Sequence, residues 1–209
     1  MLPPADNGDA ENSPLPALGL FAIVAMASSA GGLNALREVL SELPATFVPV
    51  VVVQHLDPRH RSLMAEILGQ RAAMRVCEAQ DGDVLARGTV YIAPPDRHLL
   101  VNADGSLSLT QTEPVRFVRP SADLLFESVA ASFRERAIAV VLTGSGSDGR
   151  MGVRAVKKTG GMVIAQDRAS SDFFGMPGAA IETGAVDLVL ALNKIGGALV
   201  ALVMGGDGS

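Results

Sequence analysis

The sequence has few of the residues on which several classes of protein depend. A single cysteine, Cys77, excludes an internal disulfide. The absence of tryptophan and an aromatic content of 4% leave valine, isoleucine, leucine and alanine to fill the core. The formal net charge of −5 and a pI of about 5.2 provide no basic surface for DNA or RNA. We therefore expect no nucleic-acid partner.

The longest early apolar run, residues 17–27, lacks the features of a targeting segment. The sixteen residues before it contain no lysine or arginine and carry Asp6, Asp9 and Glu11, whereas a secretory signal begins with positive charge. The run is also too short to span a bilayer. We predict a disordered tail at residues 1–16, a buried first strand after it, no membrane insertion and a cytoplasmic location.

What the chain does contain is an alternation of short apolar runs with helical patterns. Hydrophobic residues make up 48% of the chain, enough for a sizeable core. Leu33, Leu36, Leu40 and Leu43 recur at helical spacing, and Pro44 follows them. The alternation predicts one α/β domain over residues 17–204, with a doubly wound, mostly parallel sheet and a flexible end at 205–209. The other expected elements are strands at 20–27, 48–54, 137–144, 161–167 and 185–192, and helices at 62–71, 119–133, 149–160, 176–184 and 193–204.

Residues 74–118 depart from this alternation. Four short apolar stretches are separated by turn signals, among them Asp81-Gly82 and Asp104-Gly105. We predict a small antiparallel hairpin insertion near one edge of the sheet. After it, Ser121 is a plausible N-cap for the helix that follows Pro120.

Ligands of open parallel sheets bind outside the carboxyl ends of the strands, so residues after strands are the candidates for function. The first such stretch is Ala27-Ser28-Ser29-Ala30-Gly31, a strand-to-helix turn of small residues. Such a turn can mount a nucleophilic serine and place the N–H of Ala30 toward an oxyanion. It can equally be an ordinary turn in which a serine caps the helix.

The second stretch is Gln54-His55, at the end of the next strand. His55 can act there as a general base, although a lone histidine is more often a capping or partly buried residue. His55, Asp57 and His60 also form an H-x-D-x-x-H pattern, but three histidines and one cysteine leave a zinc site dependent on carboxylates.

The third stretch carries Gly144, Gly146 and Gly149 between a strand and a helix, with Asp167 about twenty residues further on. This G-x-G-x-x-G pattern allows a Rossmann-like nucleotide site. Two features weaken that interpretation: the pattern comes late in the chain, and Asp148 would oppose a pyrophosphate. In the alternative interpretation Asp148 orients an imidazole, so that Ser29, His55 and Asp148 form a triad.

At these residues the chain resembles the catalytic domain of the CheB chemotaxis receptor methylesterases. The resemblance rests on several motifs in order along the chain: Ser29-Ala30-Gly31-Gly32, Gln54-His55, Tyr91-Ile92-Ala93-Pro94 with His98, and residues 119–123, 142–149, 165–167 and 174–177. It implies hydrolysis of glutamate methyl esters on chemoreceptor cytoplasmic helices, with methanol as the other product, and also glutamine deamidation.

The resemblance further implies Ser29 as nucleophile, His55 as base, Asp148 as its partner, Ala30 as oxyanion donor, and no cofactor or metal. Ser28 is not the expected nucleophile, because the family's serine precedes x-Gly-Gly. Ala27, Ser28, Ser145 and Ser147 depart from residues common in the family. A non-catalytic signalling module with the same fold is the remaining alternative.

Control of the activity is a further expectation from the resemblance. The family usually carries an N-terminal receiver domain, and the roughly twenty residues before the first expected strand are too few to fold as one. We expect activity without phosphorylation, with control from a regulatory partner, a fused domain or substrate localisation.

Overall fold

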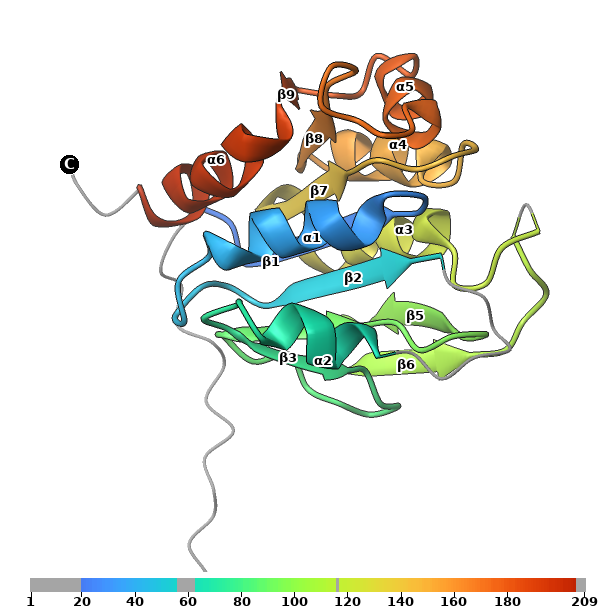
Figure 1. Ribbon diagram of the computed structural model, residues 1–209. Coiled ribbons are helices and arrows are strands. Elements are labelled where there is room, and N and C mark those ends of the chain that lie inside the picture. Colours follow the sequence, from blue (N-terminus) through green and yellow to red (C-terminus); the bar gives the residue numbers. More distant parts are fainter. Residues whose placement is uncertain (1–19, 56–62, 116, 206–209) are drawn as a thin grey trace, which may run out of the picture.

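The protein forms an α/β sandwich of three layers, seen in a computed structural model that describes residues 20–55, 63–115 and 117–205 (Figure 1). A seven-stranded sheet has the order β3-β4-β2-β1-β7-β8-β9, and every pairing within it is parallel. A separate antiparallel pair consists of β5 and β6. This confirms the predicted fold class.

The strands are β1 (Ile23–Ser28), β2 (Val50–Gln54), β3 (Arg75–Glu78), β4 (Thr89–Ile92), β5 (His98–Val101), β6 (Leu107–Thr110), β7 (Ala137–Val141), β8 (Met162–Gln166) and β9 (Leu188–Leu190). The helices are α1 (Gly32–Ser41), α2 (Met64–Gly69), α3 (Ala122–Phe133), α4 (Arg150–Lys158), α5 (Gly175–Ile181) and α6 (Leu192–Met204), with a 3₁₀ turn at Arg134–Arg136.

The central strands are buried on both faces, which explains their continuous apolar sequences. All residues of β1, β2 and β7 are buried. Along β1, Ala25 and Ala27 join the hydrophobic core beneath α3, α4 and α5, whereas Val24 and Met26 join the core beneath α1, α2 and α6. The helices therefore lie on both faces of the sheet (Figure 1).

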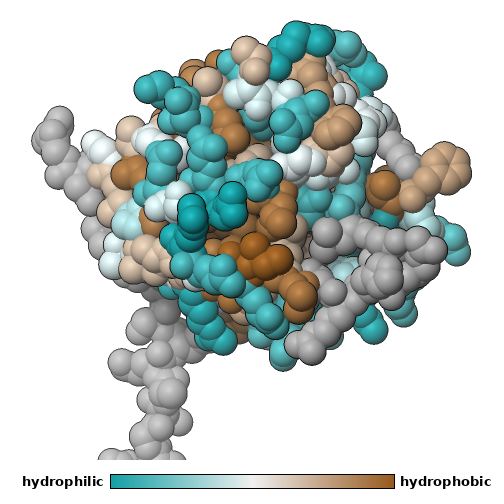
Figure 2. Space-filling model, in the orientation of Figure 1, coloured by the Kyte–Doolittle hydropathy of each residue, from teal (hydrophilic) through white to brown (hydrophobic). Residues whose placement is uncertain are grey.

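The surface in the view of Figure 2 is mostly hydrophilic, with a hydrophobic patch in the region between α1 and α2. Partly buried hydrophobic residues of both helices, Leu33 and Ala65 among them, pack against the core on this face. No helix in the described ranges combines the length and the apolar composition needed to cross a bilayer.

The expectation for residues 74–94 needs a correction. We predicted antiparallel strands there, but β3 and β4 pair in parallel and form an edge of the main sheet. The turn at Asp81-Gly82 exists, yet it packs along β6: Gly82 N donates to Leu107 O at 2.8 Å, and Asp81 accepts a hydrogen bond from Leu109 N. Only β5 and β6 form the predicted hairpin. The expected tail at 1–16 lies outside the described residues, as does the end of the chain from 206.

Candidate active site

The three predicted site residues follow three neighbouring strands. Ser29 comes directly after β1, His55 directly after β2, and Asp148 lies in the loop between β7 and α4. In the sheet β1 lies between β2 and β7. The chain runs from β1 to β2 on one side of it, and only later crosses back to form β7 on the other side. The three side chains thus stand at a topological switch point, where ligands of such sheets bind.

Backbone hydrogen bonds fix the first two positions relative to the strands beside them. Ser29 N donates to Thr143 O at 3.0 Å, and His55 N donates to Ser28 O at 3.1 Å. The turn at Ser29 is therefore hydrogen-bonded to the end of β7 on one side and to the end of β2 on the other.

His55 and Asp148 are in direct contact. The distance from His55 Nε2 to Asp148 Oδ2 is 2.9 Å, and their side chains are 15% and 4% exposed. An ionised carboxylate only accepts hydrogen bonds, so the neutral imidazole carries its proton on Nε2. Nδ1 is then the nitrogen with the lone pair that can take a proton from a nucleophile.

Asp148 has three further partners, all at the start of α3. Its Oδ1 accepts from Ser121 Oγ at 2.9 Å and from Asp123 N at 3.1 Å, and its Oδ2 accepts from Ala122 N at 2.6 Å. Burial acts to raise the pKa of Asp148, but the hydrogen bonds from His55, Ala122 and Asp123 outweigh it and hold the pKa below its ordinary value. The carboxylate stays ionised beside the imidazole.

The two adjacent serines have different surroundings. Ser28 is fully buried, and its hydroxyl donates to Gln54 Oε1 at 2.6 Å. Ser29 is partly exposed, and within the described residues its hydroxyl makes no hydrogen bond. Ser28 is therefore a structural residue and Ser29 the available hydroxyl. No hydrogen bond joins Ser29 Oγ to His55 here, and catalytic hydrogen bonds often form only when substrate binds.

The turn after Ser29 leaves backbone donors free. Helix α1 begins at Gly32, and its N-cap, Gly31, has φ +77° with no side-chain cap. Among the described residues no acceptor binds the N–H of Ala30. This N–H lies at the positive end of the α1 dipole, where an oxyanion is stabilised.

Gly144 lies close to the Ser29 side chain. A Cβ at position 144 would stand 2.9 Å from Ser29 Cβ and 2.4 Å from Met176 Sδ. Gly144 N already donates to Phe173 O. The first glycine of the G-x-G-x-x-G pattern is thus packed against the serine turn and α5, and Asp148 of the same loop faces His55. This arrangement does not favour the nucleotide-binding interpretation.

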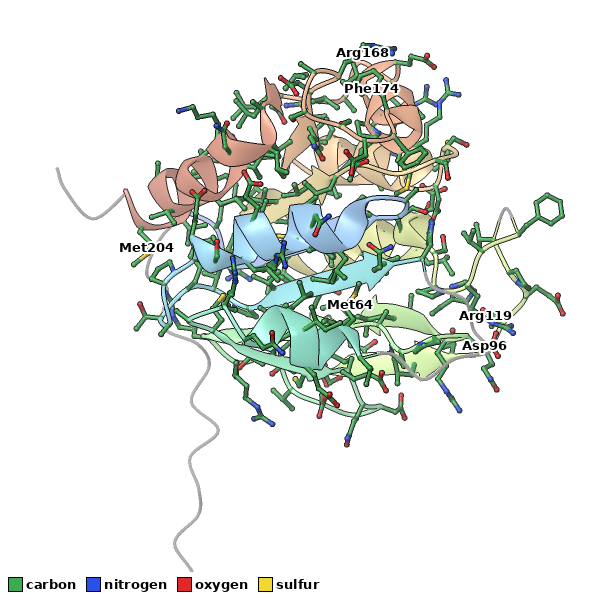
Figure 3. All side chains as sticks on the ribbon, in the orientation of Figure 1. Met64, Asp96, Arg119, Arg168, Phe174 and Met204 are labelled. Atoms are coloured by element: carbon green, nitrogen blue, oxygen red, sulfur yellow. The ribbon has the colours of Figure 1, made fainter. Side chains whose placement is uncertain are left out.

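Figure 3 labels two interacting pairs of loop residues, Asp96 with Arg119 beside β5 and β6, and Arg168 with Phe174 beside α5. Arg119 Nη2 lies 2.6 Å from Asp96 Oδ1, and Arg119 Nη1 also donates to Thr112 O at 2.8 Å. The guanidinium of Arg168 lies 4.2 Å from the ring centre of Phe174. The first pair supports the segment that leads into Ser121, and the second supports the segment that leads into α5.

Neither a metal nor a nucleotide is indicated by the described side chains. Asp57 and His60 of the H-x-D-x-x-H pattern lie outside the described residues. In the ranges that are described, no three His, Cys, Asp or Glu side chains cluster as metal ligands would. The carboxylate of Asp167 accepts hydrogen bonds from Ser170 N and Ser170 Oγ and so stabilises its own loop.

Sequence reasoning missed the contributions of Gln54 and Ser121 to this site. Gln54 was noted only as part of a motif, and Ser121 only as an N-cap. Ser121 occupies the N-cap position, but its hydroxyl binds Asp148 instead of capping α3. Neither side chain is reactive, so no chemical signal in the sequence distinguishes it from any other polar residue.

The fold and the side chains at its switch point define an α/β protein with the constellation of a serine hydrolase. Residues 24–199 match the CheB methylesterase family, and the chain belongs to that family. The resemblance recognised from the motifs is thereby confirmed.

Comparisons with known proteins agree with this assignment. A protein-glutamate methylesterase/protein-glutamine glutaminase of Maricaulis maris (strain MCS10) is 40% identical over an alignment of 209 positions that covers 98% of this chain and 51% of that protein. The protein-glutamate methylesterase FrzG of Myxococcus xanthus is 42% identical over 88% of this chain and 55% of its own length. The chain thus spans about half the length of these two relatives.

A solved structure has the same fold. The crystal structure of the Thermotoga maritima CheB methylesterase catalytic domain superposes with a TM-score of 0.84 at 40% sequence identity. The match covers 88% of this chain and 99% of that one. The match therefore includes nearly the whole of that catalytic domain.

Proposed function

We propose that this chain hydrolyses methyl esters of glutamate side chains on chemoreceptor-type helices and releases methanol. The observation that carries the proposal is the His55–Asp148 pair beside the Ser29 hydroxyl at the switch point of the sheet. The names of the relatives supply the substrate class, because both the Maricaulis and the Myxococcus proteins are described as protein-glutamate methylesterases.

The proposed reaction is acyl transfer through Ser29. His55 Nδ1 takes the proton of Ser29 Oγ as that oxygen attacks the ester carbonyl, and the N–H of Ala30 stabilises the oxyanion. Asp148 stabilises the imidazolium through the Nε2–H bond. His55 then gives the proton to the departing methoxide, and methanol leaves. Water, deprotonated by the same imidazole, hydrolyses the glutamyl-enzyme and regenerates Ser29.

The same residues support glutamine deamidation. In that reaction the leaving group is ammonia instead of methanol, and the glutamyl-enzyme is the same. The second half of the printed name of the Maricaulis relative, protein-glutamine glutaminase, favours this second activity.

The direct test is methanol release from a methylated receptor fragment, together with labelling by a fluorophosphonate that reacts only with an activated serine. Ser29→Ala and His55→Ala should each lower the rate by ~10³-fold or more, since members of a triad act as a unit. Both residues stand at strand ends and leave no large cavity when truncated.

Ser28→Ala is the matched control, one residue away. It loses one buried hydrogen bond, which costs about 1–3 kcal/mol of stability, and should retain most of its activity. If Ser28→Ala were inactive and Ser29→Ala active, the nucleophile assignment would be wrong. Absence of labelling and of methanol release in the unaltered protein would favour the non-catalytic signalling module.

A further inference from the structure

The side-chain amide of Gln54 connects the serine turn to the backbone of the histidine. Gln54 is the last residue of β2 and is 5% exposed. Its Nε2 donates to Ser29 O at 2.7 Å and to His55 O at 3.0 Å. Its Oε1 accepts from Ser28 Oγ at 2.6 Å. One neutral side chain therefore binds the hydroxyl of Ser28 and the backbone carbonyls of Ser29 and His55.

The orientation of this amide is determined by its partners. The carbonyl oxygens of Ser29 and His55 can only accept hydrogen bonds, so the NH₂ group must face them. The hydroxyl of Ser28 can then donate to Oε1 on the other side. Gly32 leaves the space that the amide needs, because a Cβ at position 32 would stand 2.0 Å from Gln54 Oε1.

The hydrogen bond to Ser29 O has a consequence for the oxyanion donor. Ser29 O and the N–H of Ala30 belong to one planar peptide group, so fixing the direction of the carbonyl fixes the direction of the N–H. Gly32 N also donates to Ser29 O, at 2.9 Å. With two donors on the carbonyl, the peptide resists rotation, and the N–H of Ala30 is held in place before any substrate arrives. Such preorganisation is what makes an oxyanion donor effective.

We propose that Gln54 is a positioning residue of the reaction, which aims the N–H of Ala30 at the developing oxyanion and keeps the Ser29 turn in register with His55. The inference rests on the proposed acyl-transfer function. It differs from a purely structural role for Gln54 in one respect: its loss should weaken binding of the transition state more than binding of the ester.

The first variant is Gln54→Met, which keeps the length of the side chain and removes both donors. With a methylated receptor fragment, kcat should fall ~10–100-fold, less than for removal of an oxyanion donor itself, while KM stays within about twofold. The affinity for a boronic acid, which forms a tetrahedral adduct with the serine, should fall by a similar factor. The pH profile should keep its shape, because the His55–Asp148 pair is untouched.

The second variant, Gly32→Ala, leaves Gln54 in place but removes the space that its amide occupies. The atoms nearest its new Cβ belong to the side chains of Gln54 and Ser28, so the substitution should displace the amide without altering the turn directly. It should reproduce the loss in kcat and in boronate affinity. The double variant should lose less than the sum of the two free-energy changes, because both substitutions act on one interaction.

Ser28→Ala serves as the control for stability, since it disturbs the same cluster but leaves both donors of Gln54 in place. The proposal is overturned if either folded single variant keeps kcat and boronate affinity within about twofold of the unaltered protein. It is also overturned if both variants lose only as much as Ser28→Ala. An unaltered protein without esterase activity would contradict the proposed function itself, and the two failures are thereby distinguishable.

Discussion

At the scale of single residues, hydrogen bonds fix the side chains of Asp148 and Gln54 against the ring and the backbone of His55. Asp148 accepts from four donors in two segments, His55 after β2 and residues 121–123 at the start of α3, and Gln54 uses both ends of its amide. The Ser29 hydroxyl and the Ala30 N–H have no hydrogen-bond partner among the described residues. Both groups take part in the proposed acyl transfer, and the Ser29 carbonyl between them accepts from Gln54 Nε2 and Gly32 N.

Asp148→Asn tests the role of the carboxylate. All four partners of Asp148 donate hydrogen bonds, and the NH₂ group of an asparagine cannot accept them. If the NH₂ group faces His55, the imidazole tautomer with its proton on Nε2 is no longer favoured. We expect the fold to persist while kcat falls ~10²–10⁴-fold. Measurement of methanol release alongside circular dichroism separates the two effects. Near-full activity of this variant would remove Asp148 from the triad.

The same substitution should change the response of stability to acid. The pKa of Asp148 is lowered in the folded protein from its ordinary value of 3.8. The ionised carboxylate therefore stabilises the fold at pH values above this ordinary pKa. That contribution is lost as the pH falls below about 4 and through the folded pKa. In urea unfolding between about pH 5 and 2.5, the unaltered protein should lose stability more steeply than Asp148→Asn. Parallel curves would contradict the lowered pKa.

Gly144 and Ser145 form a contrasting pair in one loop. Ser145 is exposed, and any oxyanion contact there would involve its backbone, so Ser145→Met should keep activity within about threefold. Gly144→Ala should reduce activity at least ~10-fold, because its Cβ would meet both Ser29 and Met176 at less than 3.0 Å. Kinetics of both variants with one ester substrate provide the comparison. The reverse order would show that the loop does not pack on the serine turn as described.

At the scale of elements, helices α3 and α4 cap one another with aspartates. Asp148, just before α4, accepts from the first N–H groups of α3, and Asp123, in the first turn of α3, accepts from Met151 N at 2.8 Å and Gly152 N at 2.9 Å. The sequence did not predict this exchange, because the partners are more than twenty residues apart and each helix start resembles an ordinary one. Ser121 was the expected cap for α3, yet a carboxylate from another loop takes that role.

Asp123→Ala tests the exchange. The loss of two N-terminal partners of α4 should cost ~1–2 kcal/mol and lower Tm by ~3–6 °C. The specific activity of the folded protein should fall much less than in Asp148→Asn, since the Asp123 carboxylate accepts from the start of α4, whereas Asp148 accepts from His55 itself. Thermal unfolding followed by circular dichroism gives the shift. An unchanged Tm would mean that solvent replaces Asp123 at the start of α4.

The sequence predicted the elements better than their pairing. Strands with continuous apolar runs, such as 50–54 and 137–141, lie where the pattern placed them, because burial on both faces leaves an unmistakable composition. The turn at Asp81-Gly82 suggested an antiparallel pairing of the strands around it, and that prediction was wrong. Its backbone instead bonds to Leu107, in a hairpin some twenty-five residues later. Ser29, His55 and Asp148 could be proposed from the sequence because each follows a strand and carries a side chain with a polar functional group. Gln54 has no reactive group, and only its spatial neighbours reveal its position.

At the scale of the whole molecule, the site is assembled from the centre of the sheet. The three residues follow β1, β2 and β7, which pair directly, while β4 joins β2 through Val50, Val51 and Val52. No single loop or edge contains the site, so its geometry should persist only while the central strands are paired. Loss of activity should therefore coincide with global unfolding.

The chain offers a natural probe for this expectation. It has one tyrosine and no tryptophan, so its intrinsic fluorescence reports a single place in the fold. Tyr91 lies in β4, and its hydroxyl donates to Val84 O at 2.9 Å and accepts from Ala86 N. In urea, the midpoints of tyrosine fluorescence, far-ultraviolet circular dichroism and esterase activity should agree within experimental error. A fluorescence transition at lower urea, with activity intact, would show that the β3–β4 edge unfolds as a separate unit. Loss of activity before either spectroscopic change would instead place the weakest part of the molecule in the loops at the carboxyl edge, and the site would not be held by the central strands alone.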